Sequence, residues 1–251
     1  MTKITLVTGG SRGLGRSTAL AIARRGGDLV LTYASRAEAA AEVVAEIEAL
    51  GRKAVAFPLD SGDCAAFAPF AERLGETLRR VWQRDSFDHL VNNAGHGALT
   101  PIGTTEEASF DRLVDVHFKG VYFLTQALLP LIADGGRIVN LSSGLTRVSF
   151  PGYAVYAAVK GAVEVLTRYM ARELGGRGIT VNAVAPGAIE TDFGGGAVRD
   201  IPEVNRIFAE MTALGRVGVP DDIGPMIASL LADENRWVTA QRIEVSGGQG
   251  I

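Results

Sequence analysis

The sequence is poor in cysteine and histidine and contains no long apolar run. Its one cysteine, Cys64, excludes an intramolecular disulfide and is typical of a reducing compartment, for which the cytoplasm is the simplest prediction. Three scattered histidines and one cysteine show no metal-ligand spacing, so we predict no catalytic metal. No apolar stretch approaches the ~20 residues of a membrane span, and the N-terminus lacks the apolar core of a signal peptide. We therefore expect an unprocessed protein with no membrane partner.

Positive charge is also in short supply. The 251 residues include 25 lysines and arginines against 28 aspartates and glutamates, which gives a net charge of -3 without any basic run. This balance argues against a nucleic-acid partner. Glycine, by contrast, is abundant: 31 of the 251 residues are glycine, roughly one in eight, against a usual ~7%. We expect many tight turns and places of close backbone approach.

Short apolar runs alternate with longer helical patterns along the chain. The runs that predict strands are ITLV (4–7), LVLTY (29–33), AVAF (54–57), HLVNN (89–93), RIVNL (137–141), TVNAVA (180–185) and RIEV (242–245). The longer segments between them are the crossovers expected in a parallel sheet, and no linker interrupts them. The sequence thus predicts an α/β fold, a single doubly wound Rossmann domain over residues 1–251. Its seven-stranded, mainly parallel sheet carries helices on both faces.

A helix predicted over residues 106–133 has apolar residues at all of positions 121–124. At 100° per residue they cover most of its circumference, whereas a surface helix needs one apolar stripe. Either the helix is deeply buried, or its outer face packs against another subunit. Because crossover helices lie outside the sheet, the second interpretation is favoured, and it predicts a homo-oligomer, either a dimer or a tetramer.

A glycine-rich turn follows the first predicted strand in TLVTGGSRGLGRSTALAIARRG. Gly9, Gly13 and Gly15 permit a tight turn and close backbone approach, and the helix N-terminus behind them offers free N–H groups to a pyrophosphate. Their spacing, G-x-x-x-G-x-G, differs from the usual G-x-G-x-x-G, and such a turn alone is weak evidence. Its position directly after the first strand predicts a dinucleotide site.

The end of the second predicted strand indicates which dinucleotide is bound. The strand ends at Tyr33 without the acid that would bind the ribose 2′-hydroxyl of NAD. Ser35 and Arg36 follow it, and Arg12 lies in the glycine-rich turn, so hydroxyl and guanidinium groups are available for a 2′-phosphate. NADP(H) is therefore favoured over NAD(H). The alternatives are that Ser35 caps a helix together with Glu38 and that both arginines are solvated surface side chains.

Four features in order resemble the short-chain dehydrogenase/reductase family across essentially the whole chain. They are TGGSRGLG at 8–15, NNAG at 92–95, a serine thirteen residues before a Y-x-x-x-K motif, and PGAIET at 186–191. The pattern is most similar to 3-oxoacyl-acyl-carrier-protein reductase-like members, which are usually tetramers. The resemblance implies hydride transfer between the nicotinamide of NAD(P) and a ketone or secondary alcohol.

The resemblance also implies site residues. The implied catalytic residues are Ser143, Tyr156 and Lys160. The implied cofactor contacts are Gly9, Ser11, Arg12, Gly13, Leu14 and Gly15 in the turn, Ser35 and Arg36 at the 2′-phosphate, Asp60 and Ser61 at the adenine, Asn92, Ala94 and Gly95 at the adenosine ribose, Lys160 with Tyr156 near the nicotinamide ribose, and Pro186, Gly187, Ile189 and Thr191 at the nicotinamide. Asn and Gly are also ordinary turn residues, and Asp60 could merely cap a helix over 62–83.

The chemistry explains why a tyrosine and a lysine are needed together. Tyr156 and Lys160 lie one turn apart on one face of a predicted helix. Ketone reduction develops negative charge on oxygen, which requires a proton donor within hydrogen-bond reach. We expect the Lys160 ammonium to lower the pKa of the Tyr156 phenol, and Ser143 to donate a second hydrogen bond. Tyr153 is separated from Lys160 by about 10.5 Å of helix rise, so it is expected to shape the pocket or simply pack.

His117 departs from the family pattern, in which an asparagine at this place holds a water that relays protons to the lysine. Histidine also donates and accepts, but its pKa near 6.5 would make a relay sensitive to pH. The hypothesis is that His117→Asn keeps activity while it flattens the dependence of activity on pH between about 5.5 and 7.5. The alternative is a helix histidine satisfied by a neighbouring carbonyl. His96 is expected in a loop near the mouth of the pocket.

The segment at about residues 191–212 combines three glycines with an amphipathic helix and is predicted to be a lid. With Thr146, Phe150, Tyr153 and Phe193 it suggests a partly aromatic substrate pocket. The leading prediction is an NADP(H)-dependent oxidoreductase of ketones and secondary alcohols, either 3-oxoacyl-thioester reductase-like or a general carbonyl reductase. A sugar or steroid dehydrogenase of the same family is the alternative. A non-catalytic cofactor-sensing protein would not need the serine, tyrosine and lysine together.

Overall fold

A parallel sheet organises the structure, a computed structural model that describes residues 2–251. Within these residues seven strands lie in the order β3-β2-β1-β4-β5-β6-β7, and every neighbouring pair is parallel. Their bounds are β1 (Ile4–Val7), β2 (Asp28–Tyr33), β3 (Ala54–Pro58), β4 (Phe87–Asn92), β5 (Ile132–Leu141), β6 (Thr180–Pro186) and β7 (Arg242–Val245). The predicted strands and fold class are confirmed.

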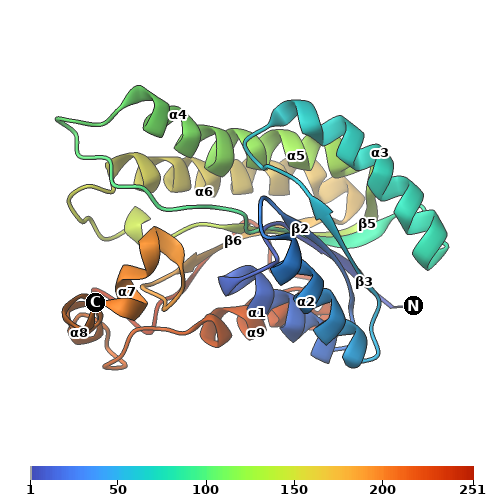
Figure 1. Cartoon of the computed structure of the whole chain (residues 1–251). Helices are drawn as coiled ribbons and strands as arrows, with labels where there is room; N and C mark the ends of the chain where they lie inside the picture. The colour runs from blue at the N-terminus through green and yellow to red at the C-terminus, as the bar shows by residue number, and fades with distance from the viewer. Residues whose placement is uncertain (1) are drawn as a thin grey trace.

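Helices cover both faces of the sheet (Figure 1). Leu6 and Val7 are neighbours on β1, yet they belong to different apolar cores because successive strand residues point to opposite faces. With both faces covered, the strands are continuous apolar runs. One face carries α1 (Gly13–Arg24), α2 (Ala37–Ala49) and α9 (Pro220–Leu230), and the other carries α3 (Phe67–Thr77), α4 (Glu107–Val114), α5 (Gly120–Leu128) and α6 (Ala154–Leu174). The short helices α7 (Ala197–Asp200) and α8 (Pro202–Glu210) lie at one end of the molecule, beside the C-terminus.

The strand order reverses beside β1. This strand pairs with β2 on one side and with β4 on the other, so the chain crosses over the sheet between β3 and β4. In open α/β sheets the loops diverge at such a reversal and leave a crevice outside the carboxyl ends of the strands. The fold therefore places a ligand site where β1 and β4 end.

The long helix predicted over residues 106–133 is divided and shorter. A π-helical turn over Asp115–Lys119 separates α4 from α5, and a 3₁₀ turn over Leu129–Leu131 ends the helix. Pro130 in that turn has no N–H to donate, and Ile132 is already extended with ψ of 126°. Strand β5 therefore begins several residues earlier than predicted.

The outer face of α5 is apolar but not buried. Val121 and Leu124 pack inside, whereas Tyr122 and Phe123 are 42% and 41% exposed. The interpretation that the whole helix is deeply buried is wrong. An apolar surface remains on the outside of the molecule, as the oligomer interpretation requires, and the oligomer stays a prediction.

A buried polar network joins β4 and β5 to the helices that cover them. The Asn92 amide donates to Thr125 Oγ1 at 3.1 Å and to Asn140 Oδ1 at 2.9 Å. The Asn140 amide in turn donates to Thr167 Oγ1 at 3.0 Å. All four side chains are buried, so each lost bond would leave a polar atom without water or partner.

We predict that Asn92→Ala lowers the free energy of unfolding by about 1 to 3 kcal/mol, because Asn140 Oδ1 then loses its buried donor. Equilibrium urea unfolding followed by circular dichroism measures the change. Thr125→Val is the matched control and should cost less, since it keeps the side-chain shape and leaves the Asn92 amide one acceptor. A loss below about 0.5 kcal/mol for Asn92→Ala would contradict a structural role.

Candidate active site

A cleft of about 620 Å³ lies outside the carboxyl ends of the strands. Its walls come from the segments that follow β1 to β6, together with residues of α6 and the 191–212 segment. The predicted site residues that line it are Gly9, Ser11, Arg12, Gly13, Leu14, Gly15, Ser35, Arg36, Asp60, Ser61, Ala94, Gly95, Ser143, Tyr156, Lys160, Pro186, Gly187, Ile189 and Thr191. Among the predicted site residues, Asn92 is the exception within the described chain.

The glycine-rich turn forms one wall. Gly9 and Gly13 have φ of +64° and +53°, a region that side chains with a Cβ rarely adopt. A Cβ on Gly15 would lie 2.2 Å from the Gly9 carbonyl oxygen, so the turn closes only with glycine there. No side chain among residues 2–251 caps the start of α1, which leaves its first N–H groups for a ligand. This cradle fits a pyrophosphate.

Arg12 and Arg36 meet at the adenosine end of the cleft. Both donate to one carboxylate oxygen of Asp192, at 2.9 and 3.1 Å. The arginines are therefore paired rather than simply solvated. The capping alternative for Ser35 is wrong, because α2 starts at Ala37 and no side chain within the described residues caps it. Two guanidinium groups and a hydroxyl fit a 2′-phosphate.

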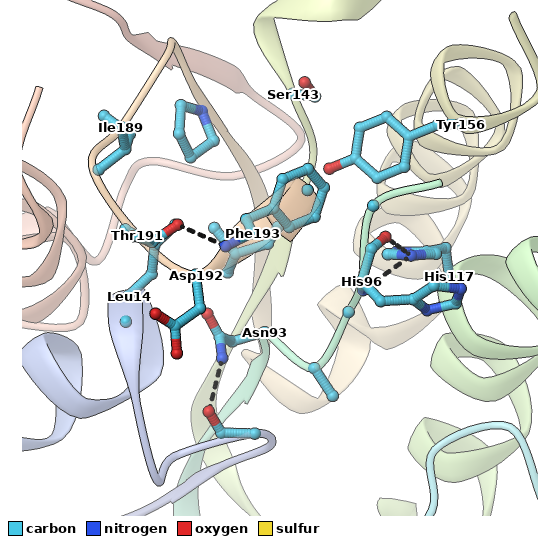
Figure 2. A pocket seen from close by; sticks show the side chains of 18 of the residues that line it. Leu14, Asn93, His96, His117, Ser143, Tyr156, Ile189, Thr191, Asp192 and Phe193 are labelled. Atoms are coloured by element: carbon cyan, nitrogen blue, oxygen red, sulfur yellow. Dashed lines mark hydrogen bonds between the residues drawn. The ribbon is translucent and has the colours of Figure 1, made fainter. Parts of the chain in front are cut away.

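The NNAG motif contributes its second asparagine rather than its first. Asn92 is turned into the core by the network described above, so the prediction that it lies beside the adenosine ribose is corrected. Asn93 lines the cleft and donates to the carbonyls of Thr8 and Gly9, at 2.8 and 3.2 Å. It braces the glycine-rich turn (Figure 2).

Asp60 lines the cleft as predicted. It pairs with Arg112, at 3.0 and 3.1 Å, and accepts from the Gly62 N–H. The helix that follows is capped by Asp63, which accepts from Ala65 N. The alternative that Asp60 merely caps that helix is therefore wrong.

Ser143, Tyr156 and Lys160 meet at the other end of the cleft. Ser143 follows β5, and α6 carries the tyrosine and lysine one turn apart, both buried. The Lys160 ammonium donates to the carbonyl of Leu141 at 2.7 Å and lies 5.7 Å from the centre of the Tyr156 ring. Figure 2 shows the hydroxyl oxygens of Ser143 and Tyr156 on the same side of the cleft.

Burial, rather than the ammonium, sets the protonation of this pair. Burial raises the pKa of Tyr156 well above its usual value, and the Ser143 hydroxyl offsets this in part. Burial also lowers the pKa of Lys160 to about 7, so the lysine is only partly charged at neutral pH. Burial outweighs any effect of Lys160 on the phenol in this arrangement, so the expectation that the ammonium lowers the phenol pKa stays a prediction. The phenol stays protonated, which suits a proton donor.

His117 lies in the π-helical turn and is buried against Tyr156. Its Nε2 is 2.8 Å from the carbonyl oxygen and 3.2 Å from the amide nitrogen of His96, and its ring meets the Tyr156 ring edge-on with centroids 5.1 Å apart. A Cβ on Gly95 would lie 2.6 Å from the imidazole, so the glycine makes room for it. Within residues 2–251, Nδ1 has no hydrogen-bond partner.

The surroundings of His117 favour its neutral imidazole. Burial, and then the nearby Lys160, hold its pKa well below 6.5. This direction argues against the hypothesis that its titration makes activity sensitive to pH between about 5.5 and 7.5, and that hypothesis stays open to the test below. The alternative, a histidine held by a neighbouring carbonyl, describes what is found.

The loop after β6 forms the wall beside the catalytic pair. Gln249 accepts from the Ala188 N–H at 2.8 Å and lines the cleft, although nothing in the sequence singled it out. Phe193 covers Tyr156, with ring centroids 5.4 Å apart (Figure 2). Phe150 and Tyr153 line this end as predicted. Thr146 does not, because its hydroxyl faces away, 2.9 Å from the Ser143 carbonyl oxygen and 2.8 Å from the Glu164 carboxylate.

Comparisons with known proteins identify the family. A family model described as enoyl-(acyl carrier protein) reductase matches residues 9–249. A hydroxynaphthalene reductase-like protein, Arp2 of Metarhizium brunneum, is 37% identical over 98% of this chain and 94% of its own. The chain belongs to the short-chain dehydrogenase/reductase family. This conclusion agrees with the four sequence features and with the parallel sheet.

Solved structures of this family agree. The promiscuous reductase LugOII, which catalyses keto-reduction at C1 during lugdunomycin biosynthesis, has 39% identity and a TM-score of 0.93 over 99% of this chain and 98% of its own. The angucycline C-6 ketoreductase LanV with bound NADP has 38% identity and a TM-score of 0.90 over 98% and 95%. This chain is similar to ketone reductases along its full length.

Two structural features bear on the expected absence of a membrane span and of a metal. No helix in residues 2–251 combines the length and apolarity needed to cross a membrane. Within the same residues no three His, Cys, Asp or Glu side chains are grouped to hold a metal ion. The expectation of no catalytic metal stays a prediction.

We predict that the imidazole of His117 does not titrate between about pH 5.5 and 8, because a base whose pKa is lowered by burial takes up its proton only at more acidic pH. ¹⁵N-detected histidine spectra recorded across this range measure the tautomer and charge. His117→Asn assigns the resonance. A His117 midpoint between about pH 6 and 7 would show that the ring is hydrated and restore the pH-sensitive relay.

Proposed function

We propose that this protein is an NADP(H)-dependent reductase of fused-ring aromatic ketones. The observation that carries the proposal is the aromatic wall beside Tyr156. Phe150, Tyr153, Phe193 and Phe208 line the cleft there, and Phe150 and Phe208 pack edge to face 5.4 Å apart. Flat aromatic substrates stack well against such rings. The comparisons support the same class, since Arp2 and LanV are named for hydroxynaphthalene and angucycline substrates.

NADP(H) is proposed as the cofactor on two grounds. The cleft offers a pyrophosphate cradle at the glycine-rich turn and a cationic group, Arg12 and Arg36, where a 2′-phosphate would lie. LanV, similar over the whole chain, binds NADP. When bound, the reduced nicotinamide supplies the hydride.

The roles of the chain's own residues follow from their positions. Tyr156 donates its phenolic proton to the substrate oxygen as negative charge develops on it, and Ser143 donates a second hydrogen bond to the same oxygen. Proton transfer from a phenol of raised pKa remains favourable, because an alkoxide is a far stronger base than a phenolate. Lys160, with a pKa of about 7, gains and loses its proton near neutral pH and can reprotonate the tyrosine.

The remaining proposals concern organisation and location. The chain is proposed to be one domain over residues 1–251, with about 191–212 as a lid whose Phe193 closes over the substrate. Three successive glycines, Gly194 to Gly196, all have positive φ and give this segment a sharp turn. The lone, half-buried Cys64 supports a cytoplasmic location.

A second candidate is a 3-oxoacyl-thioester reductase, which the family model's description favours. Its substrate is a flexible chain and not a flat ring system. The aromatic wall favours the ring system, because stacking needs no ordering of a flexible acyl chain.

We predict that kcat/KM for a hydroxylated naphthalenone exceeds that for a 3-oxoacyl thioester by about tenfold or more, because the aromatic wall binds the flat ring in the transition state. Loss of absorbance at 340 nm with NADPH measures both, with sugars and steroids as further arms. A thioester turned over faster than any aryl ketone would contradict the substrate class.

The variant Tyr156→Phe tests the proposed proton donor, because it removes the phenolic oxygen and keeps the ring. It should lower kcat by about 10²- to 10⁴-fold while NADPH affinity, measured by fluorescence, changes little. Turnover at the wild-type rate would show that another group donates the proton.

We predict a homo-oligomer that buries the exposed aromatic side chains of α5 and α6. Tyr122, Phe123 and Tyr169 are 42%, 41% and 65% exposed, and the rings of Tyr122 and Phe123 lie together with centroids 5.1 Å apart. Light scattering after gel filtration should give a multiple of the chain mass of 26.4 kDa. Phe123→Glu with Tyr169→Glu should give the monomer, since buried unpaired carboxylates are costly. A wild-type mass of one chain would refute the oligomer.

A further inference from the structure

Asp192 stands at the meeting point of three arginines from three segments. Its Oδ2 accepts from Arg12 of the glycine-rich turn at 2.9 Å and from Arg36 after β2 at 3.1 Å. Its Oδ1 accepts from Arg199 of α7 at 2.5 Å. The aspartate itself belongs to the segment proposed as a lid, so its carboxylate joins that segment to the adenosine end of the cleft.

The carboxylate is a stable anion in that position. Hydrogen bonds from Arg199 and Arg12 hold the pKa of Asp192 at about 2, so it is charged at neutral pH. Arg199 is also paired with Asp200, through both carboxylate oxygens. Arg12 and Arg36, by contrast, make no other ion pair within residues 2–251. These two arginines are thus the ones that depend on Asp192.

We propose that Asp192 competes with the 2′-phosphate of NADP(H) for Arg12 and Arg36, which makes it a specificity-determining residue for the cofactor. The inference rests on the proposed function, because it takes these arginines as the 2′-phosphate site. A carboxylate oxygen bound by two guanidinium groups occupies the place of a phosphate oxygen. The two anions repel each other at close range, so the carboxylate and the phosphate weaken each other's hold on the pair.

The competition favours the phosphate but weakens its binding. A 2′-phosphate carries nearly two negative charges and three acceptor oxygens, whereas Asp192 offers one charge shared with Arg199. Binding of NADP(H) therefore includes the loss of two ion pairs, and the apparent affinity falls accordingly. NAD(H) has no 2′-phosphate and leaves both pairs in place. Asp192 thus narrows the preference for NADP(H) over NAD(H).

The exchange also reaches the reacting end of the cleft. Phe193, the next residue, packs on the Tyr156 ring, and Figure 2 shows its ring and the Asp192 carboxylate on opposite sides of the segment. When a phosphate displaces the Asp192 carboxylate, the backbone that shifts is bonded directly to Phe193, which covers the Tyr156 phenol.

Binding of 2′,5′-ADP and of 5′-AMP, measured by isothermal titration calorimetry, tests the proposal without any turnover. Asp192→Asn keeps the shape and removes the charge, and it should tighten 2′,5′-ADP binding by about 3- to 20-fold, the strength of two exposed ion pairs. Affinity for 5′-AMP should change by less than about twofold. Asp192→Ala, which also removes the acceptor oxygen, should act in the same direction.

Asp200→Asn is the matched control. It removes the same charge from a carboxylate that pairs with Arg199 alone, so 2′,5′-ADP affinity should stay within about twofold of wild type. Unchanged or weaker 2′,5′-ADP binding by Asp192→Asn would mean that the carboxylate orients the arginines, and it would overturn the competition alone. If wild type binds 2′,5′-ADP no better than 5′-AMP, the cofactor assignment falls and this inference falls with it.

Discussion

The hydrogen bond from the Lys160 ammonium to the carbonyl of Leu141, 2.7 Å long, is the contact on which the site depends. Leu141 ends β5, and Ser143 lies two residues beyond it. The contact therefore holds α6 against the end of the strand and brings Tyr156 and Ser143 to one cleft. A buried ammonium is costly, and one carbonyl offsets that cost only in part. The lowered pKa of Lys160 is the physical consequence.

The sheet was predictable because its signal is local. Strands buried on both faces are continuous apolar runs, and helical segments separate them, so the sequence alone predicted the strands and their parallel arrangement. The break in the helix before α5 was not predictable, because the apolar pattern continues through the π-helical turn at Asp115–Lys119. That turn is where His117 is placed against Tyr156, so the missed feature belongs to the site.

The sequence predicted which segments form the site. It predicted less well which side chains of those segments face the cleft. Asn92 and Asn93 are neighbours at a strand end, and successive residues there point to opposite sides. The motif cannot tell which one faces the cleft. The pKa values were less predictable still, because they depend on how deeply Tyr156, Lys160 and His117 are buried, which only the packed fold determines. The close fit of Gly95 to His117 joins residues more than twenty positions apart and has no sequence signal.

Residues 191 to 193 connect parts of the cleft that would otherwise be independent. Thr191 lies against the glycine-rich turn, Asp192 binds the arginines of the adenosine end, and Phe193 covers the phenol. Consecutive Cα atoms are about 3.8 Å apart, so none of these contacts can shift far without moving the next. The three glycines that follow all have positive φ, so the chain turns sharply directly after Phe193. Charge at one end of the cleft and aromatic packing at the other therefore act on one short stretch of backbone.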